Sequence, residues 1–130
     1  MDIHTINENL SIRSLDDFAA LTADEQGMLY EWLVGQELLR RNAIQGGEIL
    51  APLAFWQDKN HEIDFVISEK DLLEVKRGRS SALEFSWFVK QFPKQTLTVI
   101  STDTFSTEKI NGITLEKFLL GNEKEDLERQ

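Results

Sequence analysis

Cysteine is missing from all 130 residues of the chain. Its absence excludes disulfides, cysteine-ligated zinc, iron–sulfur clusters and thiol nucleophiles together. Histidine is scarce: His4 and His61 lie far apart in the sequence and leave little basis for a histidine metal site. The longest apolar run, residues 49–56, contains a proline and is too short to cross a bilayer. The N-terminus also lacks the pattern of a secretory signal, so we expect a cytoplasmic protein without membrane contact.

Positive charge is also in short supply, because 14 Lys and Arg face 23 Asp and Glu, giving a net charge of −9. The deficit lies in residues 1–39 and 95–130, whereas residues 40–94 carry nine bases against eight acids. A domain that grips a phosphate backbone is usually basic overall. Any contact with DNA is therefore expected to be weak and confined to the middle of the chain. The candidate contacts there are Arg40, Arg41, Arg77 and Arg79.

What is present suits one globular domain. The apolar fraction is 41% and the charged fraction 28%, and no repeat, low-complexity tract or linker interrupts the chain. We expect a single domain over residues 1–130, with a core of about 25–120 and an acidic C-terminal tail from about 122.

The periodicity of apolar residues predicts an α/β domain with a small mixed sheet flanked by helices. A short helix is expected over 14–21. Thr22 and Glu25 form a capping-box pattern, which predicts a helix to about Arg41 that is apolar around almost its full circumference. Ser81 and Glu84 form a second such pattern. The predicted strands cover 53–56, 62–67, 72–75, 97–100 and 110–113. The later helices are expected from 81 to 92, burying Leu83, Trp87 and Phe88 or their neighbours, and from Thr114 to Gly121.

Side-chain alternation sorts the second and third strands into faces. Ile63, Phe65 and Ile67 are expected on one face of the sheet, with Asp64 on the other. Glu74 and Lys76 should project together from the next strand. Asp64 lies opposite Glu74 in an antiparallel pair only if paired residue numbers sum to 138, which requires an odd loop, most simply residues 68–70.

Such a pair of carboxylates on one sheet face suits Mg²⁺ or Mn²⁺, which prefer oxygen ligands. A lysine beside the ion can stabilise the negative charge of a phosphate undergoing substitution. Alternation alone is also compatible with a solvated strand face carrying a surface ion pair.

The residues Glu62-Ile-Asp64-Phe, followed by Glu74-Val-Lys76, resemble the core motif of the PD-(D/E)xK, or restriction-endonuclease-like, nuclease superfamily. Upstream, Gly27-x-x-x-Glu31-x-x-Val34-x-x-Glu37 resembles the first core helix of that fold. The combination is closest to an uncharacterised nuclease-like C-terminal domain of prokaryotic AAA-type ATPases. The resemblance departs from those patterns in two ways. Ile63 stands where the motif often has proline, and no Walker A pattern occurs in this chain.

The resemblance implies a restriction-endonuclease-like αβββαβ core and Mg²⁺- or Mn²⁺-dependent hydrolysis of phosphodiester bonds in DNA. Asp64 and Glu74 would be metal ligands and Lys76 the assisting cation. Glu31, or alternatively Glu37, would complete the acidic site. The alternative function is a catalytically inactive nuclease-fold module that binds nucleic acid or serves as a protein-interaction adaptor. Possible protein partners are a second copy of the chain or an ATPase.

Overall fold

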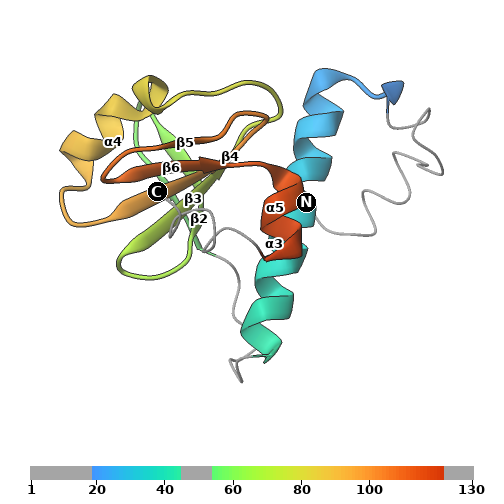
Figure 1. Ribbon diagram of the computed structural model, residues 1–130, viewed down its shortest axis with the longest axis horizontal. Helices are drawn as coiled ribbons and strands as arrows, with labels where there is room; N and C mark the ends of the chain where they lie inside the picture. The colour runs from blue at the N-terminus through green and yellow to red at the C-terminus, as the bar shows by residue number, and fades with distance from the viewer. Residues whose placement is uncertain (1–18, 45–53, 122–130) are drawn as a thin grey trace.

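The computed structural model of the protein describes residues 19–44 and 54–121, and Figure 1 shows their arrangement. The predicted acidic tail and most of the predicted helix at 14–21 lie outside these residues. The elements are α3 (Ala23–Ile44), β1 (Ala54–Gln57), β2 (Glu62–Val66), β3 (Asp71–Val75), the 3₁₀ helix η1 (Ala82–Phe85), α4 (Ser86–Gln91), β4 (Thr96–Ile100), β5 (Phe105–Ser106), β6 (Ile110–Ile113) and α5 (Leu115–Leu120).

The strands form one mixed sheet in the order β1-β2-β3-β4-β6-β5. The pairs β1–β2, β2–β3 and β5–β6 are antiparallel, whereas β3–β4 and β4–β6 are parallel. Parallel neighbours need a crossover connection, and η1 with α4 provides it between β3 and β4. The prediction of an α/β domain with a mixed sheet is confirmed. The two-residue strand β5 carries too short a pattern to be read from the sequence.

Helices cover both faces of the sheet and divide the core into two layers. Phe85 and Phe88 of the η1–α4 segment pack on one face, against Ile63, Leu72, Leu97, Val99 and Ile110. On the other face Val34 of α3 and Phe118 of α5 pack against Phe65, Leu73, Ile100 and Ile113. Figure 1 shows α3 and α5 side by side on this second face, with α4 on the opposite side of the sheet.

The helix starts follow the predicted caps in two of three cases. The Thr22 amide donates to Glu25 Oε1 at 2.9 Å and the Glu25 amide donates to Thr22 Oγ1 at 3.1 Å, which confirms the first capping box. The Lys117 amide donates to Thr114 Oγ1 at the start of α5. The capping box at Ser81 is wrong. The Ser81 side chain makes no cap bond, because this segment opens as a 3₁₀ helix in which the Glu84 amide donates to the Ser81 carbonyl.

Two burial predictions are also corrected. The helix α3 is not enclosed all round: among the described residues of that helix only Val34, Gly35 and Glu37 are buried. Its apolar side chains outnumber the positions that the sheet can cover. Leu83, expected in the core, is 84% exposed, because the 3₁₀ geometry turns Phe85 inward instead.

A β-bulge overturns the predicted faces of β2. Ala54 pairs with Val66 and Trp56 with Ile63, so β2 advances three residues while β1 advances two. The extra residue shifts the alternation, and Ile63 and Phe65 join opposite core layers instead of sharing one. The bulge lies between Ile63 and Val66, in the part of β2 that contains Asp64.

Candidate functional site

Asp64 and Glu74 face each other across β2 and β3. Phe65 pairs with Leu73 and Val66 with Leu72, so the paired numbers sum to 138 as predicted. The Ile67 amide donates to the Asp71 carbonyl, leaving residues 68–70 as the three-residue loop. The register prediction is confirmed, although the face argument used for Ile63 and Phe65 is not.

Beyond Phe65 the two strands are joined through carboxylates. The Asp64 amide donates to Glu74 Oε1 at 3.1 Å, and the Val75 amide donates to Asp64 Oδ2 at 2.8 Å. Each acidic side chain thus accepts from the backbone of the opposite strand. These two bonds hold both carboxyl groups at the bulge, where the strands part.

The Glu74 carboxyl is buried, with only 6% of the residue exposed. Burial raises its pKa to about 9, with further contributions from a hydrogen bond to the Asp64 side chain and from the Asp64 charge. Lys76 acts in the opposite direction, and its Nζ lies 3.7 Å from Glu74 Oε2. One loosely held ammonium therefore does not balance two adjacent carboxylates. Protonation of Glu74 relieves the repulsion, and a bound cation could do so as well.

Lys76 follows directly after β3, and its ammonium lies near both the Glu74 carboxyl and the Phe85 ring. Its Nζ lies 5.8 Å from the centre of the Phe85 ring, on the side of the sheet covered by η1 and α4. The side chain remains 42% exposed. The ammonium is therefore held near Glu74 and is accessible to a ligand.

Glu31 approaches the pair from α3. Partial burial raises its pKa, and the charges of Asp64 and Glu62 raise it further. Within the part of the chain that the structure describes, no hydrogen bond or ion pair joins Glu31 to Asp64, Glu74 or Lys76. The structure thus brings three of the four predicted site residues into contact and leaves Glu31 as an electrostatic neighbour.

Glu37 has a different setting from Glu31. Arg40 donates to both of its carboxylate oxygens, at 2.8 and 2.6 Å, and Arg41 donates to Oε2 at 2.7 Å. The hydrogen bond from Arg40 is the largest cause that lowers the pKa of Glu37 to about 2, with Arg41 adding to it. Arg41 also donates to the Phe118 carbonyl and lies 4.3 Å from the centre of that ring. Glu37 therefore holds α3 to α5.

The predicted DNA contacts are partly occupied by protein groups. Arg40 and Arg41 bind Glu37, as described above. Arg77 donates to Gln26 Oε1 at 3.1 Å, and Arg79 lies 3.4 Å from Asp103 Oδ1. The Arg79 side chain is 89% exposed, more than that of Arg40 or Arg41.

A cleft of about 300 Å³ adjoins the carboxylate pair, and we call it the Glu74 cleft. The residues that line it include Glu74, Lys76, Glu84, His61 and Trp87. His61 stacks on Trp87 with ring centres 4.0 Å apart and planes at 11°. The sequence predicts Trp87 in the core and Glu84 in a helix cap. It does not predict the contact of Trp87 with His61, because no spacing rule connects a histidine to a residue 26 positions later.

The oxygen donors of Asp64 and Glu74 are of the kind that a divalent cation requires. Among residues 19–44 and 54–121, no three His, Cys, Asp or Glu residues are grouped closely enough to hold an ion. Two carboxylates are nevertheless a sufficient protein contribution for Mg²⁺, which often keeps several waters. Asp64 and Glu74 fit that chemistry, because both are oxygen donors and their mutual repulsion is uncompensated.

Together these features define a mixed α/β protein with an acidic pair and a lysine at the strand ends. No helix of the described residues has the length and apolarity needed to span a membrane. The chain belongs to the family described as a domain of unknown function (DUF4143), whose model matches residues 26–118. This family is commonly found in proteins associated with AAA-type ATPases. No curated protein and no solved structure matches the chain.

Proposed function

We propose that the protein is a Mg²⁺- or Mn²⁺-dependent, nuclease-type phosphodiesterase that acts on DNA. The observation that carries the proposal is the contact between Asp64 and Glu74 across β2 and β3, with Lys76 beside them. The element order supports it, because a helix, three antiparallel strands, a helix and a parallel strand resemble a restriction-endonuclease-like αβββαβ core.

In this proposal Asp64 and Glu74 hold the divalent cation. When bound, the cation supplies a Lewis acid for the phosphate and lowers the pKa of a coordinated water. Lys76 directs its ammonium into the Glu74 cleft and stabilises negative charge that develops on the phosphate oxygens. Glu31, which lies close enough to Asp64 for the charge of Asp64 to raise its pKa, serves as an outer ligand or positions the attacking water.

The test is a calorimetric titration with MnCl₂ and MgCl₂, followed by a cleavage assay on plasmid, duplex and single-stranded DNA. Wild type is expected to bind about one ion, whereas Asp64→Asn and Glu74→Gln should lose about tenfold or more in affinity. Lys76→Gln should retain the ion and lose cleavage. Glu69→Gln, in the loop between β2 and β3, is the matched control and should behave as wild type. Equal ion binding by wild type and Asp64→Asn would reject the proposal.

A second candidate function is an inactive nuclease-fold adaptor. The observation that favours it is the pairing of basic side chains with acidic ones, since Arg40 and Arg41 bind Glu37 and Arg79 lies against Asp103. Those pairs leave less positive charge for a phosphate backbone. Ion binding without cleavage of any DNA form would support this second candidate.

A further inference from the structure

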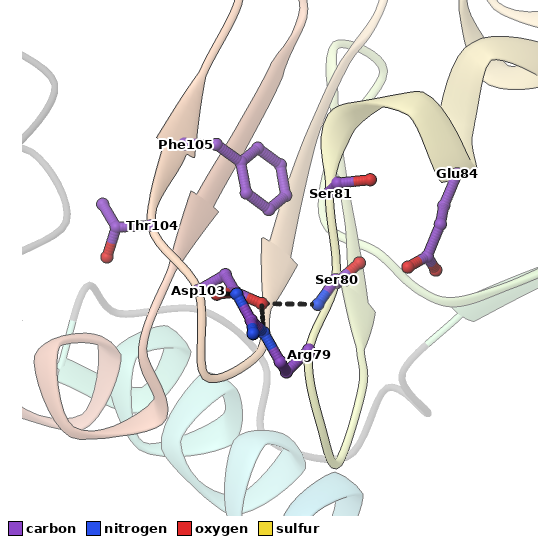
Figure 2. Close-up of a pocket in the computed structure, with 7 residues that line it drawn as sticks. All are labelled: Arg79, Ser80, Ser81, Glu84, Asp103, Thr104 and Phe105. Atoms are coloured by element: carbon purple, nitrogen blue, oxygen red, sulfur yellow. Dashed lines mark hydrogen bonds and ion pairs between the residues drawn. The ribbon is translucent and has the colours of Figure 1, made fainter.

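A second cleft adjoins the carboxylate site. This cleft of about 410 Å³, called here the Ser80 cleft, lies between the segment that follows Lys76 and the segment that precedes β5. In Figure 2 Ser80 and Ser81 lie between Glu84 on one side and Asp103 and Phe105 on the other. Glu84 lines both this cleft and the Glu74 cleft. The two clefts therefore share Glu84 as a lining residue and lie next to each other.

The Ser80 cleft contains a polar group without a partner. Ser80 is 7% exposed, and its hydroxyl makes no hydrogen bond among the residues that the structure describes. A buried hydroxyl without a partner costs about 1–3 kcal/mol, so it calls for an explanation. The backbone amide of Ser80 is already used, because it donates to Asp103 Oδ2 at 2.8 Å. The hydroxyl is thus an unpaired polar group buried in the wall of the cleft.

Cationic and aromatic groups complete the lining. The Arg79 guanidinium lies 3.4 Å from Asp103 Oδ1, which is a long contact, and the Arg79 side chain is highly exposed. The guanidinium can therefore turn toward an anion. The ring of Phe105 lines the same cleft. In the Glu74 cleft the corresponding groups are Lys76 and the stacked pair of His61 and Trp87. Each cleft therefore combines one accessible cation with an aromatic surface, beside the carboxylates of Asp103 and Glu84 in the Ser80 cleft and of Glu62, Glu74 and Glu84 in the Glu74 cleft.

We propose that the Ser80 cleft and the Glu74 cleft together hold an unpaired DNA strand, with one nucleotide in each cleft. The inference rests on the proposed function, since it names the substrate of that site. Phosphates meet Lys76 and Arg79, and bases stack on His61 and on Phe105. A cation and an aromatic ring repeated along a groove are the pattern that single-stranded nucleic acids require. A duplex keeps its bases stacked inside and does not offer them to either ring.

The test measures fluorescence anisotropy of a fluorescein-labelled dT12 oligonucleotide in low salt and EDTA, so that no metal is needed. Arg79→Gln is expected to weaken binding about threefold to tenfold, and Phe105→Leu about tenfold through lost stacking. Lys70→Gln removes the same charge from the β2–β3 loop, just before β3 begins, and should change affinity less than twofold. Ser80→Ala should weaken binding while its thermal midpoint stays equal to or above that of wild type.

Substitution of Glu84 is expected to raise the affinity for dT12, in contrast to the losses expected for Arg79→Gln and Phe105→Leu. Glu84→Gln should tighten dT12 binding, because it removes a negative charge from the shared wall, whereas Glu69→Gln in the β2–β3 loop should not. Duplex DNA that binds as tightly as dT12, or dTMP that competes as well as dT12 does, would overturn the inference. So would equal losses in Arg79→Gln and Lys70→Gln.

The two proposals fail separately. Suppose that dT12 binding depends on Arg79 and Phe105 and that no Mn²⁺ binds. This result would reject the metal-dependent function and support strand binding in the two clefts. Suppose instead that Mn²⁺ binding depends on Asp64 and that dT12 binding is insensitive to Arg79 and Phe105. This result would support the metal site and reject strand binding in the two clefts.

Discussion

The amide nitrogen of Asp64 lies 3.1 Å from Oε1 of Glu74, and the amide of Val75 lies 2.8 Å from Oδ2 of Asp64. These two bonds take the place of ladder bonds at the bulge in β2 and hold two acidic groups against each other. The backbone thereby fixes a geometry that the charges themselves oppose. Burial and the neighbouring Asp64 raise the pKa of Glu74 to about 9 as a result.

Glu74→Gln is expected to change how stability depends on pH. The folded-state pKa of Glu74 lies above its unfolded value, so between about pH 4.5 and 9 the folded state retains a proton that the unfolded state releases. Wild-type stability should therefore fall as pH rises through that window. The neutral amide removes the effect. At pH 8.5 the variant should be more stable by about 1 kcal/mol or more, which is a rise of about 4 °C in thermal midpoint.

Thermal unfolding followed by circular dichroism at pH 5, 7 and 8.5 in EDTA checks this. At pH 5 the two midpoints should agree closely, and the exposed-loop variant Glu69→Gln should follow wild type throughout. A Glu74→Gln variant less stable than wild type at pH 8.5 would show that the carboxylate stabilises the fold and that its pKa is not raised.

Under the proposed function, the same proton links metal affinity to pH. An ion held by Asp64 and Glu74 must displace the proton from Glu74, so binding at pH 7 should release close to one proton. Affinity for Mn²⁺ should rise about tenfold per pH unit below pH 9. Calorimetry in two buffers of different ionisation enthalpy measures the released proton directly. Binding whose heat is independent of the buffer would show that Glu74 is not a ligand.

The register of the acidic pair was predictable from the sequence for a simple reason. An odd loop between two strands makes residues at equal distances from its centre face each other, so Asp64 and Glu74 follow from counting. The faces of β2 were not predictable, because they depend on the bulge against β1. A bulge is set by long-range pairing and leaves no local pattern around Ile63 and Phe65.

Glu37 on α3 likewise shows which contacts can be predicted from the local sequence and which depend on residues far away in the chain. The spacing in α3 predicts that a buried carboxylate there needs a partner, and Glu37 finds it in Arg40 and Arg41. The contact of Arg41 with Phe118 on α5 joins segments 77 positions apart and could not be inferred. The sequence predicts Arg41 as a DNA contact, and the structure shows its side chain in contact with Glu37 and Phe118.

Glu37→Gln is expected to destabilise the protein, in contrast to Glu74→Gln. The hydrogen bonds from Arg40 and Arg41 lower the folded-state pKa of Glu37 to about 2. This stabilisation is present above about pH 4.5 and is lost as pH falls toward 2. At pH 7 the variant should lose about 1–3 kcal/mol, because a charged hydrogen-bonded network is broken. Urea unfolding at pH 7 and pH 3 measures the difference, which should shrink at the lower pH.

A comparison of the two arginines serves as the control. Arg41→Gln should cost more stability than Arg40→Gln, because Arg41 also contacts the carbonyl and ring of Phe118, whereas Arg40 is 57% exposed. Equal losses in both variants would show that Glu37 acts within α3 alone and does not join it to α5.

The salt dependence of dT12 binding tests how many basic side chains of the two clefts contact phosphates. Lys76 and Arg79 line the two clefts, whereas Arg40 and Arg41 are held by Glu37. Neutralising two phosphates of a single strand predicts a slope of about −1.4 for the logarithm of affinity against that of salt concentration. Arg79→Gln should reduce the slope by about 0.7. A slope unchanged by that substitution would place the strand elsewhere on the protein.

Gly112→Ala is expected to disturb the wall of the Ser80 cleft from the strand beneath it. A Cβ atom at Gly112 in β6 would lie 2.6 Å from Cδ1 and Cζ of Phe105, which pairs with it from β5. The ring would have to leave its place, because overpacking of this kind costs about 1–3 kcal/mol.

In the double variant Gly112→Ala, Phe105→Ala the clash is gone, so the Gly112 substitution should cost less there than in wild type. A thermodynamic cycle of unfolding free energies in urea measures this coupling. Additive losses would show that Gly112 is needed for its backbone and not for the space that it leaves to Phe105. Through the displaced ring, Gly112→Ala should also weaken dT12 binding and leave Mn²⁺ affinity as in wild type, since Asp64 and Glu74 lie on other strands.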